Sequence, residues 1–267
     1  MNHLRRELAP ISDGAWAQID AEASRTLKHF LTARRLVDFA GPDGWTKDAV
    51  ARGRVDEVSQ APAGIRARIR TVQPLVEYQA EFWLDRTALD AIDRGARDAD
   101  IDAVRDAARR LAIAEDEAVF LGNRAALVTG IAEGTPNAKL EISDDYRDYP
   151  QSVARAVSTL QTIGIAGPYA VALGPRCYTG VVETTEMGGY PVLEHLRLIA
   201  GGPVLWAPAV DGAIVLSLRG GDYELTVGQD ISIGYLDHDD MNVHLYLEES
   251  FTFQIFTPEA AVHLSYT

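Results

Sequence analysis

The amino-acid sequence predicts an α+β fold, with helices in the first two thirds of the chain and strands in the last third. Two observations support this prediction. Apolar residues recur at spacings of three and four in residues 12–31 and 99–121, which is the spacing of one helical face. After Gly201 and Gly202 the chain consists of short apolar runs separated by glycine-containing turns, which is typical of strands. Helices and strands do not alternate regularly, so we expect a mixed central region rather than repeated βα units.

The first expected element is a helix over residues 12–31. Ser12 or Asp13 provides a side chain that can cap the first turn. The apolar face of this helix consists of Trp16, Ile19, Ala23, Leu27 and Phe30. Residues 41–44, Gly-Pro-Asp-Gly, then predict a turn or loop that separates this segment from the next.

A different pattern, with a period of two, covers residues 50–84. Arg66, Arg68 and Arg70 alternate with Ala67 and Ile69, after a turn at residues 61–64. This alternation predicts a long two-stranded ribbon. An isolated ribbon has little core of its own, so we expect the rest of the chain or a neighbouring copy to cover it.

Further helices and one short strand are expected between these segments and the C-terminal third. Residues 99–121 have a broad apolar face, and Gly122 can end that helix. Pro150 stands in the first turn of another helical block, where proline is favoured. Residues 169–173 form a short apolar strand, and Pro175 begins the next helix.

The last third is expected to contain several strands. Residues 204–207, 213–218 and 223–227 are apolar runs joined by Asp211-Gly212 and by residues 219–222. Because glycine adopts positive φ without strain, both connections are hairpin-type sequences. Residues 243–256 form a last, longer strand-like stretch.

Composition and charge exclude several classes of protein. The 267-residue chain carries a net charge of −14, whereas a nucleic-acid-binding surface needs excess Lys and Arg. No window approaches 18 uninterrupted apolar residues, and Arg5 and Arg6 are not followed by the apolar region of a signal peptide. We therefore expect neither a nucleic-acid nor a membrane partner, and a cytoplasmic location. Cys177 is the only cysteine, which excludes an intrachain disulfide framework.

The sequence contains no motif of a common active site, so we expect no enzyme and no cofactor. The glycine-rich nucleotide loops and the G-x-S-x-G nucleophile motif are both absent. Cys177 and His195 can in principle form a thiolate–imidazole pair. We interpret Cys177 instead as a small buried hydrophobic residue, because it stands alone in an apolar segment.

Two acidic clusters are candidates for metal or catalytic sites. Residues 237–240, Asp-His-Asp-Asp, combine carboxylates with an imidazole, and a metal-dependent hydrolase is one alternative. Contiguous ligands rarely all face one ion, so we interpret this cluster as a solvated turn before the strand at Val243. Residues 115–117, Glu-Asp-Glu, are treated similarly, because consecutive helical residues point about 100° apart and do not form a carboxylate pair.

A family resemblance rests mainly on residues 219–235, RGGDYELTVGQDISIGY. This run closely resembles the signature of the encapsulin shell proteins, the linocin and culture-filtrate-antigen bacteriocin family. Further matching segments occur in the same order as in that family, at residues 8–11, 16, 34–38, 74–77, 92–95, 114–116, 167–169, 190–191, 206–209 and 249–253. The resemblance covers essentially the whole chain and looks closest to the actinobacterial branch.

The resemblance implies the tailed-phage major capsid protein fold, with a P-domain, an A-domain and an extended E-loop. The implied division is an N-terminal arm with an interior helix (1–45), an E-loop (46–78), a P-domain (79–133), an A-domain (134–222) and a return to the P-domain (223–267). The implied partner is the protein itself, in a closed icosahedral cage of about 60 subunits. The cage would enclose a cargo enzyme, a dye-decolourising peroxidase or a ferritin-like protein, held by a C-terminal targeting peptide. A phage or prophage major capsid protein is the alternative.

Three sets of site residues follow from this resemblance. The cargo-peptide groove is assigned to Leu27, Phe30, Leu31, Arg34, Asp38, Ile231 and Ile233. The five-fold pore loop is assigned to Glu183, Thr184, Thr185, Glu186, Met187, Gly188, Gly189 and Tyr190. The inter-subunit contacts of the E-loop are assigned to Arg52, Arg54, Arg66, Arg68 and Arg70.

Each assignment has a further consequence. Arg34 and Asp38 stand four residues apart and can instead pair with each other. A ring of pore-loop glutamates would favour cations, but Met187 and Gly189 occupy the stretch in which related shells often carry a histidine, so that histidine's gating role is not expected here. Thr87 occupies the position at which some members stack a flavin on an aromatic ring, so no flavin is expected.

Overall fold

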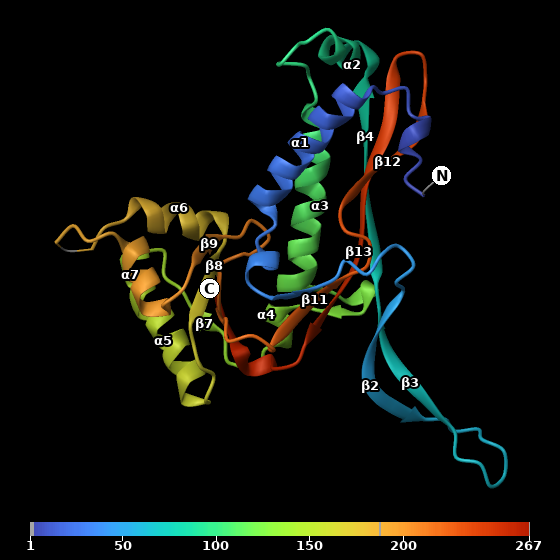
Figure 1. Cartoon of the computed structure of the whole chain (residues 1–267). Helices are drawn as coiled ribbons and strands as arrows, with labels where there is room; N and C mark the ends of the chain where they lie inside the picture. The colour runs from blue at the N-terminus through green and yellow to red at the C-terminus, as the bar shows by residue number, and fades with distance from the viewer. Residues whose placement is uncertain (1–2, 187, 267) are drawn as a thin grey trace.

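The computed structural model describes residues 3–186 and 188–266, and these form three parts (Figure 1). A tall body contains the longest helices and strands, a second lobe stands beside it, and a two-stranded ribbon projects from the base of the body. Within the described residues, no helix is both long and apolar enough to cross a membrane.

The body is a sheet whose inner face is covered by two long helices. Helices α1 (Asp13–Phe30) and α3 (Asp102–Phe120) lie side by side against this sheet (Figure 1). The hydrogen-bonded path through the sheet is β1-β11-β13-β12, and β4 pairs antiparallel with β13 along residues 242–251. Its strands are β1 (Asp38–Ala40), β4 (Val76–Asp85), β11 (Tyr223–Val227), β12 (Ser232–His238) and β13 (Asn242–Ile255).

Helix α1 begins and packs as its sequence predicts. The Ser12 hydroxyl accepts a hydrogen bond from the amide of Ala15 at 3.1 Å, which satisfies one of the free amides of the first turn. Ile19 and Ala23 are buried in a core that α3 and strands β4, β12 and β13 complete. The short helix α2 (Arg86–Asp93) closes the top of this core (Figure 1).

The second lobe is a five-stranded sheet with the order β7-β14-β10-β8-β9. Strands β8 (Tyr169–Leu173) and β10 (Ala213–Ser217) are buried along their whole length, as expected for strands covered on both faces. The other strands are β7 (Leu140–Glu141), β9 (Val204–Trp206) and β14 (Ala261–Ser265). Helices α5 (Tyr149–Thr162), α6 (Pro175–Glu183) and α7 (Val192–Ala200) pack around this sheet, with Pro150 in the first turn of α5.

The predicted hairpins of the last third are wrong. Strand β9 pairs in parallel with β8, and β10 pairs with β8 and β14, so β9 and β10 are not neighbours. Strand β11 leaves this sheet altogether and joins the body. The glycine turns at 211–212 and 219–222 do reverse or redirect the chain, but they connect strands that pair with distant segments.

Strand β14 lies apart from the other strands of residues 223–267, the range expected to return to the P-domain. It lies between β7 and β10 in the sheet of the second lobe. Its buried apolar residues fill a gap between those two strands.

The ribbon consists of β2 (Ala49–Glu57) and β3 (Arg68–Pro74), paired antiparallel with a register shift between Ala51 and Val55. The alternating sequence pattern continues to residue 84, but β4 belongs to the sheet of the body. The ribbon projects away from the rest of the chain, which leaves most of its side chains exposed (Figure 1). The remaining short elements are β5 (Gly122–Asn123), β6 (Val128–Thr129), α4 (Ile131–Gly134) and 3-10 helices at Arg6–Leu8, Ala33–Arg35, Arg124–Ala126, Tyr146–Asp148 and Pro258–Ala260.

Gly180 tests the packing of the second lobe. A Cβ atom at this position would lie 2.2 Å from the Tyr146 ring. We expect Gly180→Ala to lower the free energy of unfolding by about 1–3 kcal/mol, because overpacking outweighs the better helix propensity of alanine. In the matched control Gly14→Ala the nearest atom outside the neighbouring residues is 3.8 Å away, so denaturant unfolding should show no loss. Equal effects of the two substitutions would contradict this account.

Candidate docking site and its carboxylate cluster

The residues assigned to the cargo groove lie where α1 ends and where the chain turns from β11 into β12. Leu27 and Ile231 are half-buried against the core of the body, and Ile233 is buried within it. Phe30 instead contacts Trp206 of the second lobe, with ring centroids 5.4 Å apart. Leu27, Ile231 and Ile233 therefore share one core, whereas Phe30 packs against the second lobe.

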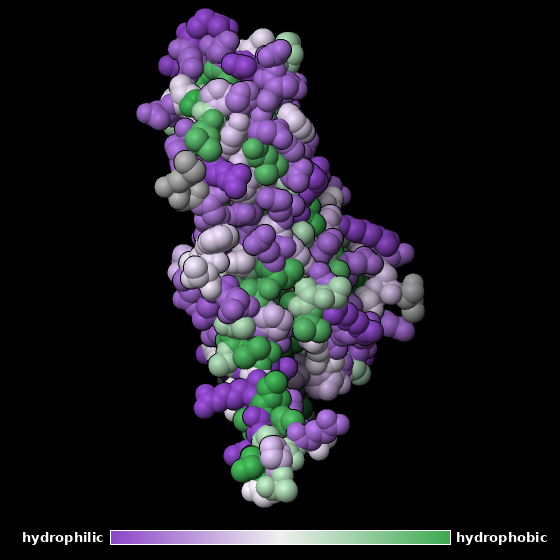
Figure 2. Space-filling model, turned by 90° about the vertical axis from the view of Figure 1, so that its right-hand side faces the viewer, coloured by the Kyte–Doolittle hydropathy of each residue, from purple (hydrophilic) through white to green (hydrophobic). Residues whose placement is uncertain are grey.

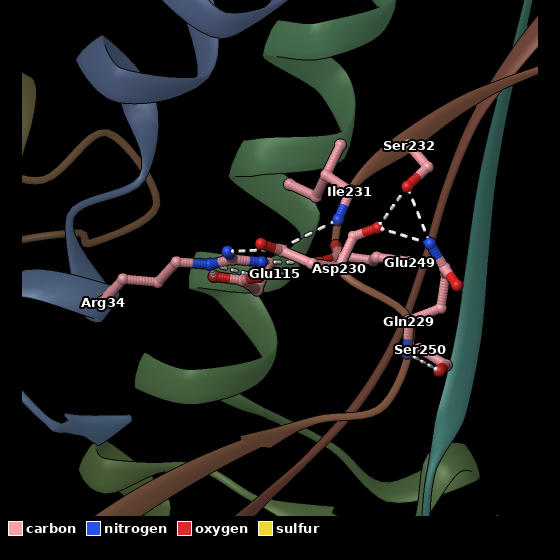
Figure 3. Close-up of polar contacts among 8 residues, drawn as sticks. All are labelled: Arg34, Glu115, Gln229, Asp230, Ile231, Ser232, Glu249 and Ser250. Carbon is pink, nitrogen blue, oxygen red and sulfur yellow. Dashed lines mark hydrogen bonds and ion pairs between the residues drawn. The ribbon is translucent and has the colours of Figure 1, made fainter. Parts of the chain in front are cut away.

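Arg34 points into a cluster of carboxylates beneath this surface (Figure 3). Its guanidinium contacts Glu115 at 2.5 Å, Asp230 at 2.7 Å and Glu249 at 3.1 Å. The Glu115 and Glu249 side chains are fully buried, and that of Asp230 is about half exposed. We call Arg34, Glu115, Asp230 and Glu249 the carboxylate cluster.

The expected pairing of Arg34 with Asp38 is wrong. Asp38 lies on the exposed start of β1, where its carboxylate accepts a hydrogen bond from the amide of Gly221 at 2.5 Å. Arg34 turns away because three carboxylates from α3, β13 and the turn before β12 face it. Neither Arg34 nor Asp38 presents its charge freely at the groove.

The interpretation of Glu115 and Asp116 as solvated residues is also wrong, since both side chains are fully buried. The helical spacing argument holds within α3, because the two residues do point in different directions. Glu115 faces Arg34, whereas Asp116 accepts hydrogen bonds at 2.9 Å from the amides of Thr32 and Ala33. Glu115 instead comes together with Glu249 of β13, because both carboxyl groups contact the same Nη2 atom of Arg34, at 2.5 Å and 3.1 Å.

Burial changes the proton affinity of this region. Desolvation, followed by the nearby Glu115, raises the pKa of Glu249 well above its ordinary value. Desolvation also raises the pKa of Asp116 to about 8, although the two amides that it accepts from oppose this shift. Burial alone would lower the pKa of Arg34, but the negative charges and hydrogen bonds of Glu115, Glu249 and Asp230 outweigh this effect, so its pKa is raised.

The turn between β11 and β12 is fixed by polar contacts (Figure 3). The amide of Gln229 donates to the Ser250 hydroxyl at 2.8 Å, and its side-chain amide donates to the Ser232 hydroxyl at 2.7 Å. The Asp230 side chain accepts from the amide of Ile231 at 2.9 Å. These bonds fix the backbone of the turn that presents Ile231, which is half-buried.

The pore-loop residues lie between α6 and α7, at the outer end of the second lobe (Figure 1). Glu183 is the last residue of α6, Thr184 follows it, Thr185 bridges to Pro191, and Tyr190 is half exposed. Glu186 contacts Nδ1 of His195 on α7 at 2.6 Å, a partner that the sequence did not indicate. Gly188 and Gly189 adopt positive φ, and Met187 lies outside the described residues.

The five arginines assigned to the E-loop all lie on or beside the ribbon. Arg66 pairs with Glu57. The other four, Arg52, Arg54, Arg68 and Arg70, are exposed and have no ion-pair partner within residues 3–186 and 188–266.

The other chemical candidates have structural partners. Cys177 is buried and lies 3.1 Å from the hydroxyls of both Tyr149 and Tyr266, whereas His195 pairs with Glu186. Asp239 closes a turn by accepting from the amides of Met241 and Asn242. In the part of the chain that the structure describes, no group of three or more His, Cys, Asp or Glu side chains is arranged to hold a metal ion.

Comparison with solved structures defines the fold. A virus-like particle from Pyrococcus furiosus superposes with a TM-score of 0.66 at 18% identity, over 92% of this chain and 98% of that chain. The capsid of Myoviridae phage XM1 superposes with a TM-score of 0.55 at 10% identity, over 89% and 92%. At such low identity these likenesses show the fold alone. The chain has the fold of a tailed-phage major capsid protein, with its P-domain, A-domain and E-loop.

Sequence comparison defines the family within that class. The chain matches the Linocin_M18 family, described as an encapsulating protein for peroxidase, over residues 1–252. It is 51% identical to a type 1 encapsulin shell protein of Rhodospirillum rubrum, over 99% of this chain and 96% of that protein. The corresponding protein of Rhodococcus erythropolis is 45% identical over 99% and 100%, and that of Mycobacterium tuberculosis is 43% identical over the full length of both.

The chain therefore belongs to the encapsulin shell protein family. This is a family of structural shell proteins rather than enzymes. Such a subunit assembles with further copies into a multi-subunit particle.

Arg34 should matter far more for stability than its neighbour in sequence. We expect Arg34→Ala to lower the free energy of unfolding by about 3–5 kcal/mol, because Glu115 and Glu249 would lose the cation that they face in the interior. Arg35 is exposed, so Arg35→Ala should change it by less than about 0.5 kcal/mol. Denaturant unfolding measures both variants. Similar values would show that the carboxylate cluster contributes little.

Proposed function

We propose that this chain forms a closed icosahedral cage of about 60 subunits in the cytoplasm and encloses a cargo enzyme held by a C-terminal targeting peptide. The family membership supports the cage. Because the family is described as an encapsulating protein for peroxidase, a peroxidase is the first cargo to test and a ferritin-like protein the second. One observation carries the assembly: the ribbon exposes apolar and basic side chains that its own chain does not cover.

The exposed apolar side chains of the ribbon indicate a protein partner. Val55, Ile69 and Val72 are 48%, 61% and 53% exposed, and Val58 and Ile65 at the tip are 40% and 61% exposed. Figure 2 shows hydrophobic side chains gathered at the lower end of the molecule, where the ribbon lies. An exposed apolar patch of this kind marks an interaction surface.

The charge of the ribbon indicates which surface it meets. Residues 49–74 carry five arginines and only two acidic residues, although the whole chain has a net charge of −14. The outer face of β4 exposes Glu77, Glu81 and Asp85 around Trp83, which is 47% exposed. We infer that the ribbon of one copy lies on this acidic face of a second copy, since opposite charges steer and align the two surfaces.

Reversing the ribbon charge should therefore prevent assembly. We expect Arg68→Glu combined with Arg70→Glu to reduce the yield of closed particles at least tenfold, because like charges would then face β4 of the neighbour. Electron microscopy and light scattering measure the particles. Arg155→Glu on α5, which makes the same change per residue away from the ribbon, is the control and should leave assembly intact. If the wild-type protein itself formed no closed particles, the proposed function would be wrong.

The docking site is proposed to accept an extended peptide through its apolar surface. Leu27, Phe30, Leu31 and Ile231 are half-buried, so each retains some exposed apolar area. Arg34 and Asp38 are engaged elsewhere, and we therefore assign peptide recognition mainly to aliphatic contacts.

A charged substitution in this surface should release cargo without affecting the cage. We expect Leu27→Asp to weaken binding of the targeting peptide at least tenfold, because it places a charge in an apolar contact. Ala17→Asp, on an exposed position nearer the start of α1, should bind as the wild type does. Co-purification of a peptide-tagged fluorescent protein with intact particles provides the measurement. Equal retention by both variants would place the docking site elsewhere.

The loop between α6 and α7 is proposed to surround a symmetry axis. Five copies of Glu183 and Glu186 would place carboxylates around the opening and favour the passage of cations over anions. The contact of Glu186 with His195 ties one of these carboxylates to α7.

A further inference from the structure

The carboxylate cluster contains one cation and three acids. Arg34 faces Glu115, Asp230 and Glu249, and the Glu115 and Glu249 side chains are fully buried. Two adjacent carboxylates in a low-dielectric interior repel each other strongly if both are ionised. One guanidinium therefore leaves the buried pair with an excess negative charge.

A missing hydrogen-bond donor points to the same place. Oε1 of Glu249 is buried and has no hydrogen-bond partner among the described residues. Oε2 of Glu115 and Oε2 of Glu249 both contact the same nitrogen, Nη2 of Arg34, at 2.5 Å and 3.1 Å, so the two carboxyl groups lie next to each other. Two carboxylates offer only acceptors, so a hydrogen bond between them requires a proton on one of them.

The other charged groups around the cluster do not supply a second cation. Asp116 lies next to Glu115 on α3 and is itself buried. Arg35, Asp38 and Glu117 are exposed, and the ring of Phe39 covers the Arg34 guanidinium at 5.3 Å from its centroid. The balance of charge within the cluster is thus set by Arg34 and by protons.

We propose that Glu115 and Glu249 share one proton at neutral pH, and that this proton fastens the N-terminal arm to the P-domain. We define the arm as residues 13–36, which include α1 and the 3-10 helix that carries Arg34. Arg34 is then a positioning residue that holds the arm on α3 and β13 rather than a contact for cargo. Release of the arm at alkaline pH would also withdraw Leu27 from the core against which Ile231 packs, a consequence for docking that rests on the proposed function.

The direction of the pH dependence follows from the shifts already described. The pKa of Glu249 and that of Asp116 are both raised on folding, chiefly by burial. A group of this kind contributes fully to stability below its unfolded pKa, and that contribution is lost as the pH rises through its folded pKa. Since the pKa of Asp116 is raised to about 8, attachment of the arm should weaken on the alkaline side of neutrality.

Hydrogen exchange of the arm in the full-length protein tests this proposal. The measured quantity is the protection of the peptide containing the amides of Thr32 and Ala33 between pH 7 and 10, corrected for the intrinsic exchange rate at each pH. In the wild type we expect protection to fall by about tenfold per pH unit for each proton released. Glu249→Gln keeps the shape and hydrogen-bonding groups of the side chain but cannot ionise. In this variant, the fall of protection with pH should therefore correspond to the release of about one proton fewer.

Two further variants make the outcome specific. Glu115→Gln should flatten the slope as Glu249→Gln does, which covers the case in which one variant fails to fold. Glu117→Gln removes the same charge from the exposed face of α3 and should follow the wild type. Protection that is independent of pH in the wild type, or equal slopes in all variants, would overturn the proposal. Hydrogen exchange of the arm needs no cargo. The shared-proton proposal can therefore fail while particle formation and peptide binding succeed, and it can hold even if particles or peptide binding are not found.

Discussion

The buried contact between Arg34 and the carboxylates of Glu115 and Glu249 is the constraint on which the body of this shell subunit depends. It joins an arm near the start of the chain, the long helix in the middle and the long strand β13 near the end. Removing either partner leaves a charge in the interior, which costs far more than the contact itself contributes. The cluster therefore contributes little net stability, but it favours the one arrangement of the arm, α3 and β13 in which the buried charges face one another.

The same contact explains how the surface above it is built. Arg34 places the end of α1 over α3, and Asp230 carries the contact into the turn that presents Ile231. Leu27 and Ile231, which are about 200 residues apart in the sequence, thus pack against the same core. The charged side chains of the carboxylate cluster are paired with one another, whereas Leu27 and Ile231 keep part of their apolar surface exposed. The cluster therefore fixes the shape of this region, and the two apolar side chains remain available to a partner.

The sequence predicted local structure better than it predicted pairing. The helical periodicity of residues 12–31 and 99–121, the Ser12 cap and the position of Pro150 were all confirmed, because each depends on neighbours within one turn. The hairpins expected between residues 204 and 227 were wrong, because a glycine turn specifies a change of direction but not the strand that will be met. The pair of Glu115 and Glu249 was missed for a related reason. A spacing argument compares residues of one helix, whereas this pair is formed across elements, and no pattern in α3 alone reports that Glu115 is buried.

The position of β14 has a consequence for how the subunit is made. This strand is synthesised after every other strand of the molecule, yet it occupies an interior place between β7 and β10. While the chain emerges from the ribosome, the sheet of the second lobe therefore has an open edge at β10 until β14 has been made. The ribbon is translated long before β14, so a nascent chain exposes the apolar and basic side chains of the ribbon while the sheet of the second lobe is still incomplete. We expect shell closure to wait for residue 265, which would give a cargo protein made at the same time a period in which to be captured.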